Sequence, residues 1–156
     1  MSKTKKTGDP GVKMIARNKR ARFDYELMER FEAGLCLTGS EVKMLRAGKA
    51  TIAEAYVKIR EGEAWLVGAN IPEYPNASYN NHETDRSRKL LLHSKQIKRL
   101  FAATREKGLT VIPLALYLRG SLFKLEIGLG KGKKHHDKRE SLKQQQSSRE
   151  MARGRY

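Results

Sequence analysis

The sequence predicts a mainly β protein, a small antiparallel barrel of about six strands with two or three added helices and basic, flexible N- and C-terminal arms. Two observations predict this class. Apolar and polar residues alternate with a period of two in several segments. Short glycine-containing turns join most of these segments and only one connection is long, which favours antiparallel neighbours over a parallel sheet.

Charge divides the 156-residue chain into three parts. The formal net charge is +16, and residues 1–22 carry eight Lys or Arg against one acid, while 131–156 carry nine against three. We therefore predict a flexible basic arm at 1–14, a barrel at 15–130 and a basic tail at 131–156. A polyanion is the expected partner. Neither arm has a Trp, Phe or Leu face to insert into lipid, so nucleic acid is favoured over membrane.

The first barrel element is expected at 23–38. Its odd positions include Phe23, Leu27, Phe31 and Leu35, with mostly charged residues between them. This alternation predicts a long, half-buried strand, although the last three of these residues also suit a helix.

A short helix should follow in TGSEVKMLRAGKA. Ser40 is the candidate N-cap, Val42 and Leu45 share one face, and Gly48 stands just past Arg46 as a stop.

The next segment, AEAYVKIREGEAWLVGANI, predicts a hairpin that turns at Glu61-Gly62. One face of the hairpin carries Ala55, Val57 and Ile59, and another carries Trp65, Val67 and Ala69. The stretch PEYPNASYNNHETDRSR is rich in Pro, Asn and Ser and predicts a long surface loop.

The clearest helix is expected in HSKQIKRLFAATREKG, where Ile97, Leu100 and Phe101 form a stripe, Ser94 is a possible cap and Gly108 ends it. Two strands should then flank Arg119-Gly120-Ser121. The complete set of elements suggests an OB-type barrel, a fold whose strand face and loops commonly bind oligonucleotides.

Motifs for catalysis, metals or cofactors are not found, so neither an enzyme, a cofactor nor a metal site is expected. Cys36 is the single cysteine, and no signal peptide or membrane span is evident, so we expect a cytoplasmic protein. His82 and His93 suit surface or hydrogen-bonding roles better than catalysis.

Two stretches combine charge with other features useful for RNA. ARNKRAR, at 16–22, is a generic basic cluster. In DRSRKLLLH, Arg86, Arg88 and Lys89 lead into three leucines, and these three basic residues are predicted to bind RNA. Because a strand alternates, Leu90 and Leu92 facing inward would leave Leu91 facing out beside the basic residues.

Five blocks of this sequence, in order, resemble the small protein B (SmpB) family, the SsrA-binding proteins: ARNKRARFDYE, FEAGLCLTGSEVKMLRAGKA, AYVKIREGEAWLVGANI, NHETDRSRKLLLH and GLGKGKKHHDKRESLK. The resemblance implies an OB-type barrel without catalytic activity. It also implies an adaptor that binds the tRNA-like domain of transfer-messenger RNA, travels with the elongation factor that carries aminoacyl-tRNA, and restarts translation on stalled ribosomes.

The resemblance further implies site residues. The RNA-binding set contains Glu32, Leu91 and Lys124, joined by Asn18, Lys19 and Arg20. Lys124 offers a charge to phosphate, and Leu91 an apolar surface for a base. Glu32 can only accept hydrogen bonds, and a surface salt bridge is its alternative role.

The tail resembles the family segment that is disordered when free and becomes helical in the codon-less decoding centre of the small ribosomal subunit. The matching residues are Lys131, Gly132, Lys133, Lys134, His136, Asp137, Lys138 and Arg139. The main alternative to this adaptor is a structural ribosomal protein or another RNA-binding protein with the same barrel.

Overall fold

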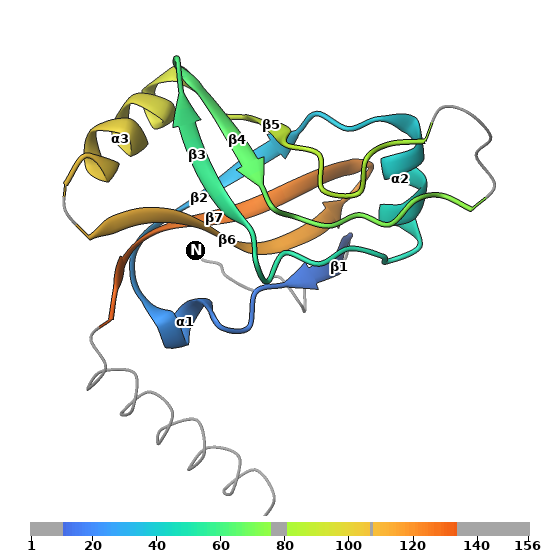
Figure 1. Cartoon of the computed structure of the whole chain (residues 1–156), viewed down its shortest axis with the longest axis horizontal. Coiled ribbons are helices and arrows are strands. Elements are labelled where there is room, and N and C mark those ends of the chain that lie inside the picture. The colour runs from blue at the N-terminus through green and yellow to red at the C-terminus, as the bar shows by residue number, and fades with distance from the viewer. Residues whose placement is uncertain (1–10, 76–80, 107, 134–156) are drawn as a thin grey trace, which may run out of the picture.

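The computed structural model describes residues 11–75, 81–106 and 108–133. These residues form seven strands and three helices (Figure 1). The strands are β1 (Val12–Arg17), β2 (Tyr25–Leu35), β3 (Tyr56–Arg60), β4 (Glu63–Val67), β5 (Arg88–Leu91), β6 (Leu109–Arg119) and β7 (Leu122–Gly132). The helices are α1 (Ala21–Asp24), α2 (Gly39–Arg46) and α3 (Ser94–Thr104). None of these described helices is long and apolar enough to cross a membrane.

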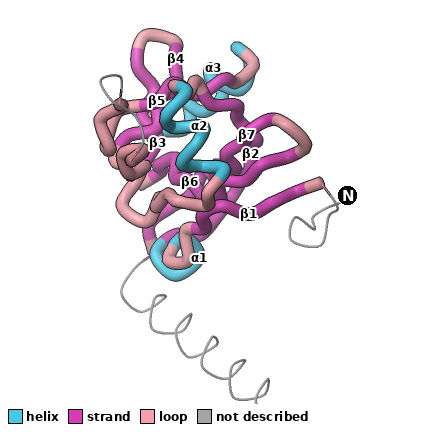
Figure 2. Tube along the Cα trace, turned by 90° about the vertical axis from the view of Figure 1, so that its right-hand side faces the viewer, coloured by secondary structure: helices cyan, strands magenta, loops and turns pink. Residues whose placement is uncertain are grey.

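Six of the strands close into an antiparallel ring. The hydrogen-bonded order is β6-β3-β4-β5-β2-β7, and β7 pairs with β6 again to complete the barrel. β1 pairs with the second half of β6 and lies outside the ring. The predicted mainly β barrel with added helices is therefore confirmed. In both views α1 and α3 lie toward opposite ends of the barrel (Figures 1 and 2).

The alternation predicted for the first long strand is observed in β2. Leu27, Phe31 and Ala33 face the interior, whereas Met28, Arg30 and Glu32 are exposed. The strand is shorter than predicted, because 21–24 form α1 and β2 begins at Tyr25. β6 and β7 meet at Gly120, whose φ of +62° suits the tight turn that the sequence predicted.

The β3–β4 hairpin turns at Glu61-Gly62 with positive φ at both residues, as predicted. Val57 pairs with Leu66, and both are buried. The core face of β4 is thus Ala64 and Leu66, and its outer face includes Trp65. The prediction that Ala69 shares a face with Trp65 is wrong, since β4 ends at Val67 and Ala69 is buried beyond it.

The two longer helices begin one or two residues earlier than predicted. Thr38, not Ser40, caps α2, because its hydroxyl accepts from the Glu41 N–H while the Glu41 carboxylate accepts from the Thr38 N–H. His93, not Ser94, is the N-cap of α3, and its N–H donates to the Gln96 side chain.

Both predicted barrel boundaries need correction. The segment assigned to the arm at 1–14 includes Val12–Met14, which pair with β6 in β1. At the other end, 131–132 belong to β7 rather than to a tail, because Lys131 pairs with Leu109. Pairing with β6 therefore brings residues at both predicted boundaries into the sheet.

The segment predicted as a surface loop is tied to the interior. His82 is buried and bonds to Ser40 and to the carbonyl of Ile71. Because a carbonyl oxygen only accepts, His82 Nε2 carries the hydrogen and Nδ1 accepts from the Ser40 hydroxyl. The hydrogen-bonding role expected for His82 is confirmed, and an exposed position for it is wrong.

Candidate nucleic-acid interface

A groove of about 630 Å³ lies where β2, β5 and β7 meet the ends of α2 and α3. Its lining brings together Glu32, Leu91 and Lys124, which come from three different strands. Apolar walls come mainly from Leu35, Leu37, Val42, Leu92, Leu122 and Phe123. The groove therefore offers a negative carboxylate, a positive amine and a large apolar surface within one site.

Strand register explains why these side chains meet. Gly34 on β2 pairs with Leu91 on one side and with Lys124 on the other. Directly opposed residues in antiparallel strands point to the same face, so this row lies on the outside of the barrel. Leu90 is 1% exposed and Leu91 is 52% exposed, which confirms the predicted alternation at this point.

Gly34 leaves the space in which Leu91 lies. A Cβ added at Gly34 would approach the Leu91 Cβ to 3.3 Å, closer than most such contacts. Glycine at this position lies between an apolar and a cationic side chain, and it lets Leu91 pack closely on the backbone of β2.

Glu32 is positioned by two groups from β6. The Tyr117 hydroxyl donates to its carboxylate, and an Arg119 guanidinium nitrogen lies 3.2 Å from the same oxygen. Burial raises the pKa of Tyr117, and the hydrogen bond to Glu32 raises it further, so the hydroxyl stays protonated and keeps donating. The salt bridge considered for Glu32 is thus present with Arg119, and Glu32 still lines the groove.

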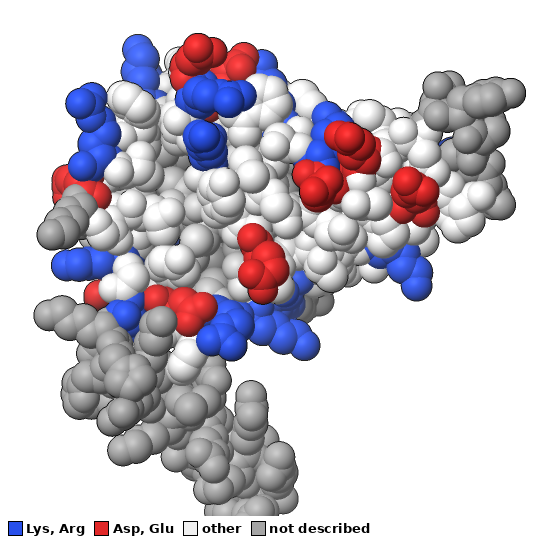
Figure 3. Space-filling view, viewed as in Figure 1, with Lys and Arg blue, Asp and Glu red and all other residues white. Residues whose placement is uncertain are grey.

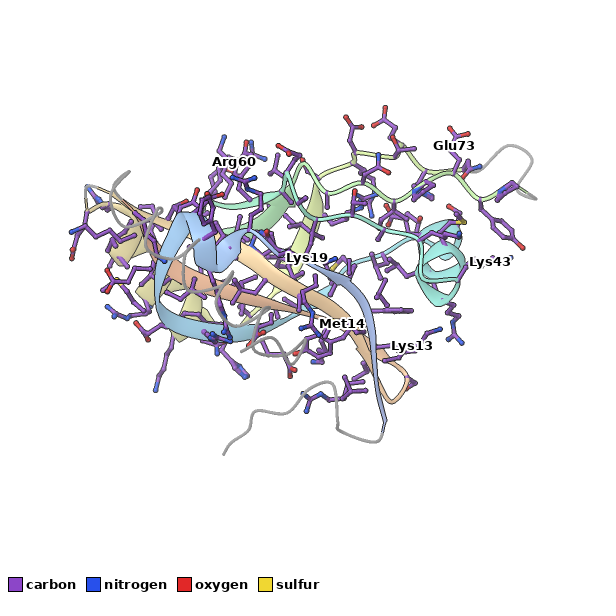
Figure 4. The ribbon with its side chains drawn as sticks, turned by 90° about the horizontal axis from the view of Figure 1, so that it is seen from below. Lys13, Met14, Lys19, Lys43, Arg60 and Glu73 are labelled. Carbon is purple, nitrogen blue, oxygen red and sulfur yellow. The ribbon has the colours of Figure 1, made fainter. Side chains whose placement is uncertain are left out.

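Asn18, Lys19 and Arg20 lie outside the groove, in the turn between β1 and α1. The Asn18 amide donates to the Pro113 carbonyl at 2.9 Å, and its backbone N–H donates to Leu114. Lys19 is exposed (Figure 4), and Arg20 pairs with Asp24. Asn18 therefore holds the turn, while Lys19 presents its charge to solvent.

Arg88 is a correction to the predicted RNA-binding set. It is 0% exposed, and it donates to Glu41 and to the Ala69 carbonyl. Arg86 also donates to Glu41 through two nitrogens. Burial by itself raises the pKa of Glu41, but the bonds from Arg86, the Thr38 N–H and Arg88 outweigh it and lower the pKa to about 2.

These two arginines anchor the segment before β5 to α2, so a contact of Arg88 with RNA is not available in this structure. Lys89 differs from them. It lies on the outer face of β5, where its amine pairs with Glu63 at 2.9 Å and its charge remains partly exposed.

Only the start of the predicted tail set is described. Lys131 and Gly132 are in β7. Lys133 follows them, and its N–H and Nζ donate to the carbonyls of Asp24 and Arg22. Lys134, His136, Asp137, Lys138 and Arg139 lie outside the described residues.

Tyr117, Arg119 and Gly34 are groove or supporting residues that the sequence did not single out. Tyr117 lies in a strand that is apolar on both faces, so no periodicity distinguishes it from core. Arg119 was considered only as part of a turn. Within the described ranges, no group of three or more His, Cys, Asp or Glu side chains could hold a metal ion.

Charge of both signs is spread over the barrel surface (Figure 3). On the face shown, Lys and Arg gather mainly at the rim, including the lower edge over β1 and α1, and acidic side chains interrupt them. The face shown is therefore not uniformly positive.

Several known proteins are similar to this chain. The SsrA-binding protein of Bifidobacterium adolescentis is 53% identical over 93% of this chain and 92% of its own length. That of Oleidesulfovibrio alaskensis is 52% identical over 96% of each. A solved structure described as "tmRNA-SmpB: a journey to the center of the bacterial ribosome" matches with a TM-score of 0.65 and 39% identity, over 85% of this chain and 94% of that one. A sequence model of the SmpB protein matches residues 15–155, and the chain therefore belongs to the SmpB family.

Proposed function

We propose that this chain is an RNA-binding adaptor of trans-translation, which binds transfer-messenger RNA and brings it to stalled ribosomes. Its membership of the SmpB family and its similarity to SsrA-binding proteins support this function. The structural observation that carries it is the groove that unites Glu32, Leu91 and Lys124 on the outer face of the barrel.

The groove is the proposed binding site for the tRNA-like domain. Lys124 attracts a phosphate, and Leu91 packs on a base or sugar that is free of its helical stack. Glu32 accepts hydrogen bonds from a base amino or imino group or from a 2′-hydroxyl. A carboxylate repels phosphate, so it adds selectivity rather than general affinity.

A second part of the proposal concerns the residues after Lys133. In this proposal they occupy the empty decoding centre, while the elongation factor is engaged through the RNA. Lys133 supports this division because its two hydrogen bonds to 22–24 attach the last described residue firmly to the barrel.

Truncation after Lys133 tests whether the barrel binds the RNA while the residues after Lys133 act on the ribosome. We expect the 1–133 variant to bind the tRNA-like domain within about threefold of the full chain in gel shifts, and to lose peptide tagging on stalled ribosomes. The cut must follow Lys133, because a cut at 130 would shorten β7. Equal loss of binding and tagging would contradict the division.

Point substitutions test the groove. Glu32→Ala and Lys124→Ala should weaken RNA binding while the circular dichroism spectrum stays unchanged. Lys49→Ala is the matched surface control, because Lys49 is exposed, follows α2 and does not line the groove. A structural ribosomal protein would instead bind ribosomal RNA alone and stay on the subunit through high-salt washing. That result would favour the alternative function.

A further inference from the structure

The only tryptophan of the chain lies between two lysines on the outer face of the barrel. Trp65 on β4 pairs with Lys58 on β3 and with Lys89 on β5, so the three side chains form one row across three strands. Burial alternates along each strand, with Val57, Ala64 and Leu90 inward, which places the row on the outer face.

This row is continuous with the groove. Lys89 and Leu91 are two residues apart on β5 and share its outer face. Trp65, which is opposite Lys89, is therefore a diagonal neighbour of Leu91, a relationship that places Cα atoms about 7–8 Å apart in antiparallel sheets. An RNA segment that lies on Leu91 has Trp65 as the next large surface along the sheet.

The edge of the Trp65 indole that carries Nε1 is buried, and this nitrogen has no hydrogen-bond partner among the described residues. The residue as a whole is partly exposed, so the exposed part of the ring, and not its N–H, is what a nucleotide can contact. The Arg60 guanidinium lies 5.9 Å from the centroid of the Trp65 ring, a cation–π arrangement that adds positive charge at the ring. Figure 4 shows Arg60 on the opposite side of the molecule from Lys13 and Met14.

The charges beside Trp65 suit a phosphate-bearing partner. Lys58 is exposed and has neither an ion pair nor a side-chain hydrogen bond within the described part of the chain. Lys89 is paired with Glu63, and both side chains are more than 40% exposed, so water screens that pair and a phosphate can compete for the amine.

We propose that Trp65 is a stacking platform for an unpaired nucleotide of the same RNA that occupies the groove, with Lys58 and Lys89 holding the phosphates on either side of that nucleotide. This inference rests on the proposed RNA-binding function and extends the interface from β2, β5 and β7 onto β3 and β4. Stacking on an aromatic ring contributes about 1–3 kcal/mol per base and tolerates any base.

Fluorescence of the single tryptophan tests the proposal directly. The full chain is titrated with the tRNA-like domain of transfer-messenger RNA, while anisotropy of a dye on the RNA reports binding independently. We expect quenching of Trp65 emission with the same midpoint as the anisotropy change, and at least a twofold fall in its accessibility to acrylamide. Binding by anisotropy with unchanged emission and accessibility would overturn the inference and leave the proposed function intact. Absence of any binding would overturn both.

Substitutions separate stacking from packing. Trp65→Leu keeps apolar bulk without the ring and should weaken RNA binding about tenfold, whereas Trp65→Phe should lose less than threefold. Lys58→Ala should lower the affinity and reduce the slope of log affinity against log salt by about 0.7–0.9, as expected for one lost phosphate contact.

Phe101→Leu on α3 is the matched control. Phe101 is 47% exposed and also has an arginine over its ring, but it is neither in the row nor in the lining of the groove. It should change RNA affinity by less than twofold. Equal effects of Trp65→Leu and Phe101→Leu would contradict the proposal. If Trp65→Leu shifts the thermal unfolding midpoint, its RNA affinity cannot separate stacking from stability. The RNA affinities of Trp65→Phe and Lys58→Ala and the fluorescence of the unaltered chain then decide whether the proposal holds.

Discussion

The Tyr117 hydroxyl on β6 donates a hydrogen bond to the Glu32 carboxylate on β2. β7 lies between these two strands and pairs with both, so the bond crosses above the strand that carries Lys124. The two side chains thus join β2 and β6 across β7, and β2 and β7 are two of the three strands that line the groove. Glu32 is held in one orientation beside the groove instead of rotating freely in water.

Tyr117→Phe should therefore weaken RNA binding by about three- to tenfold while leaving the fold intact. The ring stays buried, and only the hydroxyl is lost, so the cost in unfolding free energy should be about 1 kcal/mol, since Glu32 can be solvated. Filter binding and urea unfolding measure the two effects. Arg119→Lys retains a cation near Glu32 and is the companion variant. If Tyr117→Phe bound RNA as tightly as the unaltered chain, the positioning role of the hydroxyl would be wrong.

Local patterns predicted the strands well, because burial in an antiparallel barrel follows the period of two. The alternation at Leu90 and Leu91 placed one inside and the other outside, as observed. The same alternation places Arg88 inward, two residues before Leu90, so the prediction that Arg88 binds RNA was wrong. Its burial depends on Glu41, 47 residues earlier in the chain, and no local pattern reports such a partner.

Three residues of the groove, Glu32, Leu91 and Lys124, were predicted through the family resemblance, and the outward position of Leu91 also followed from the alternation in its strand. The geometry of the groove depends on the register that places Gly34 between Leu91 and Lys124, which is a property of three strands distant in sequence. β1 was missed for a similar reason. Asp9-Pro10-Gly11 is a turn signal directly before 12–17, but apolar and polar residues do not alternate regularly in these six residues. They gain their strand conformation by pairing with β6, about 100 residues later.

Gly34→Val should narrow the groove at its centre. Even a Cβ at this position would lie 3.3 Å from the Leu91 Cβ, so the two valine methyl groups must displace Leu91. We expect RNA affinity to fall about tenfold and unfolding free energy to fall by about 1–3 kcal/mol, the usual range for an overpacked site.

Gly39→Ala serves as the control for this substitution. Gly39 is the first residue of α2, its φ is not in the left-handed region, and an added Cβ meets nothing within 4 Å. It should leave RNA binding unchanged. An affinity for Gly34→Val equal to that of Gly39→Ala would show that the close approach of Leu91 to β2 is not needed for binding.

Alanine substitutions at the adjacent residues Asn18 and Lys19 should have different effects, one on stability and the other on RNA binding. Asn18→Ala leaves the carbonyl of Pro113 without its donor and should lower unfolding free energy by about 1–3 kcal/mol. Lys19→Ala removes an exposed charge and should leave stability within about 0.5 kcal/mol. If Lys19 contacts a phosphate, its loss weakens binding to all RNA sequences and lowers the salt slope by about one. Thermal unfolding and binding at several salt concentrations separate the two; a large stability loss in Lys19→Ala would contradict the assignment.

Glu41→Gln tests the buried network that fastens the segment before β5 to α2. Glu41 is 0% exposed and accepts hydrogen bonds from Arg86, Arg88 and the Thr38 N–H. Removing its charge leaves Arg88 buried without a counter-ion, so unfolding free energy at pH 7 should fall by about 3–5 kcal/mol.

The pH dependence follows from the lowered pKa of Glu41. This carboxyl titrates at about 2 in the folded protein and near 4.5 when unfolded. Its stabilisation is therefore complete above about pH 4.5 and is lost as pH falls toward 2, because the unfolded chain takes up the proton first. Urea unfolding between pH 7 and 2.5 should show the gap between the unaltered chain and Glu41→Gln closing over this range. Glu63→Gln, which breaks only the exposed pair with Lys89, should cost less than about 1 kcal/mol at pH 7. A gap for Glu41→Gln that stayed constant from pH 7 to 2.5 would mean that the charge of Glu41 does not stabilise this network.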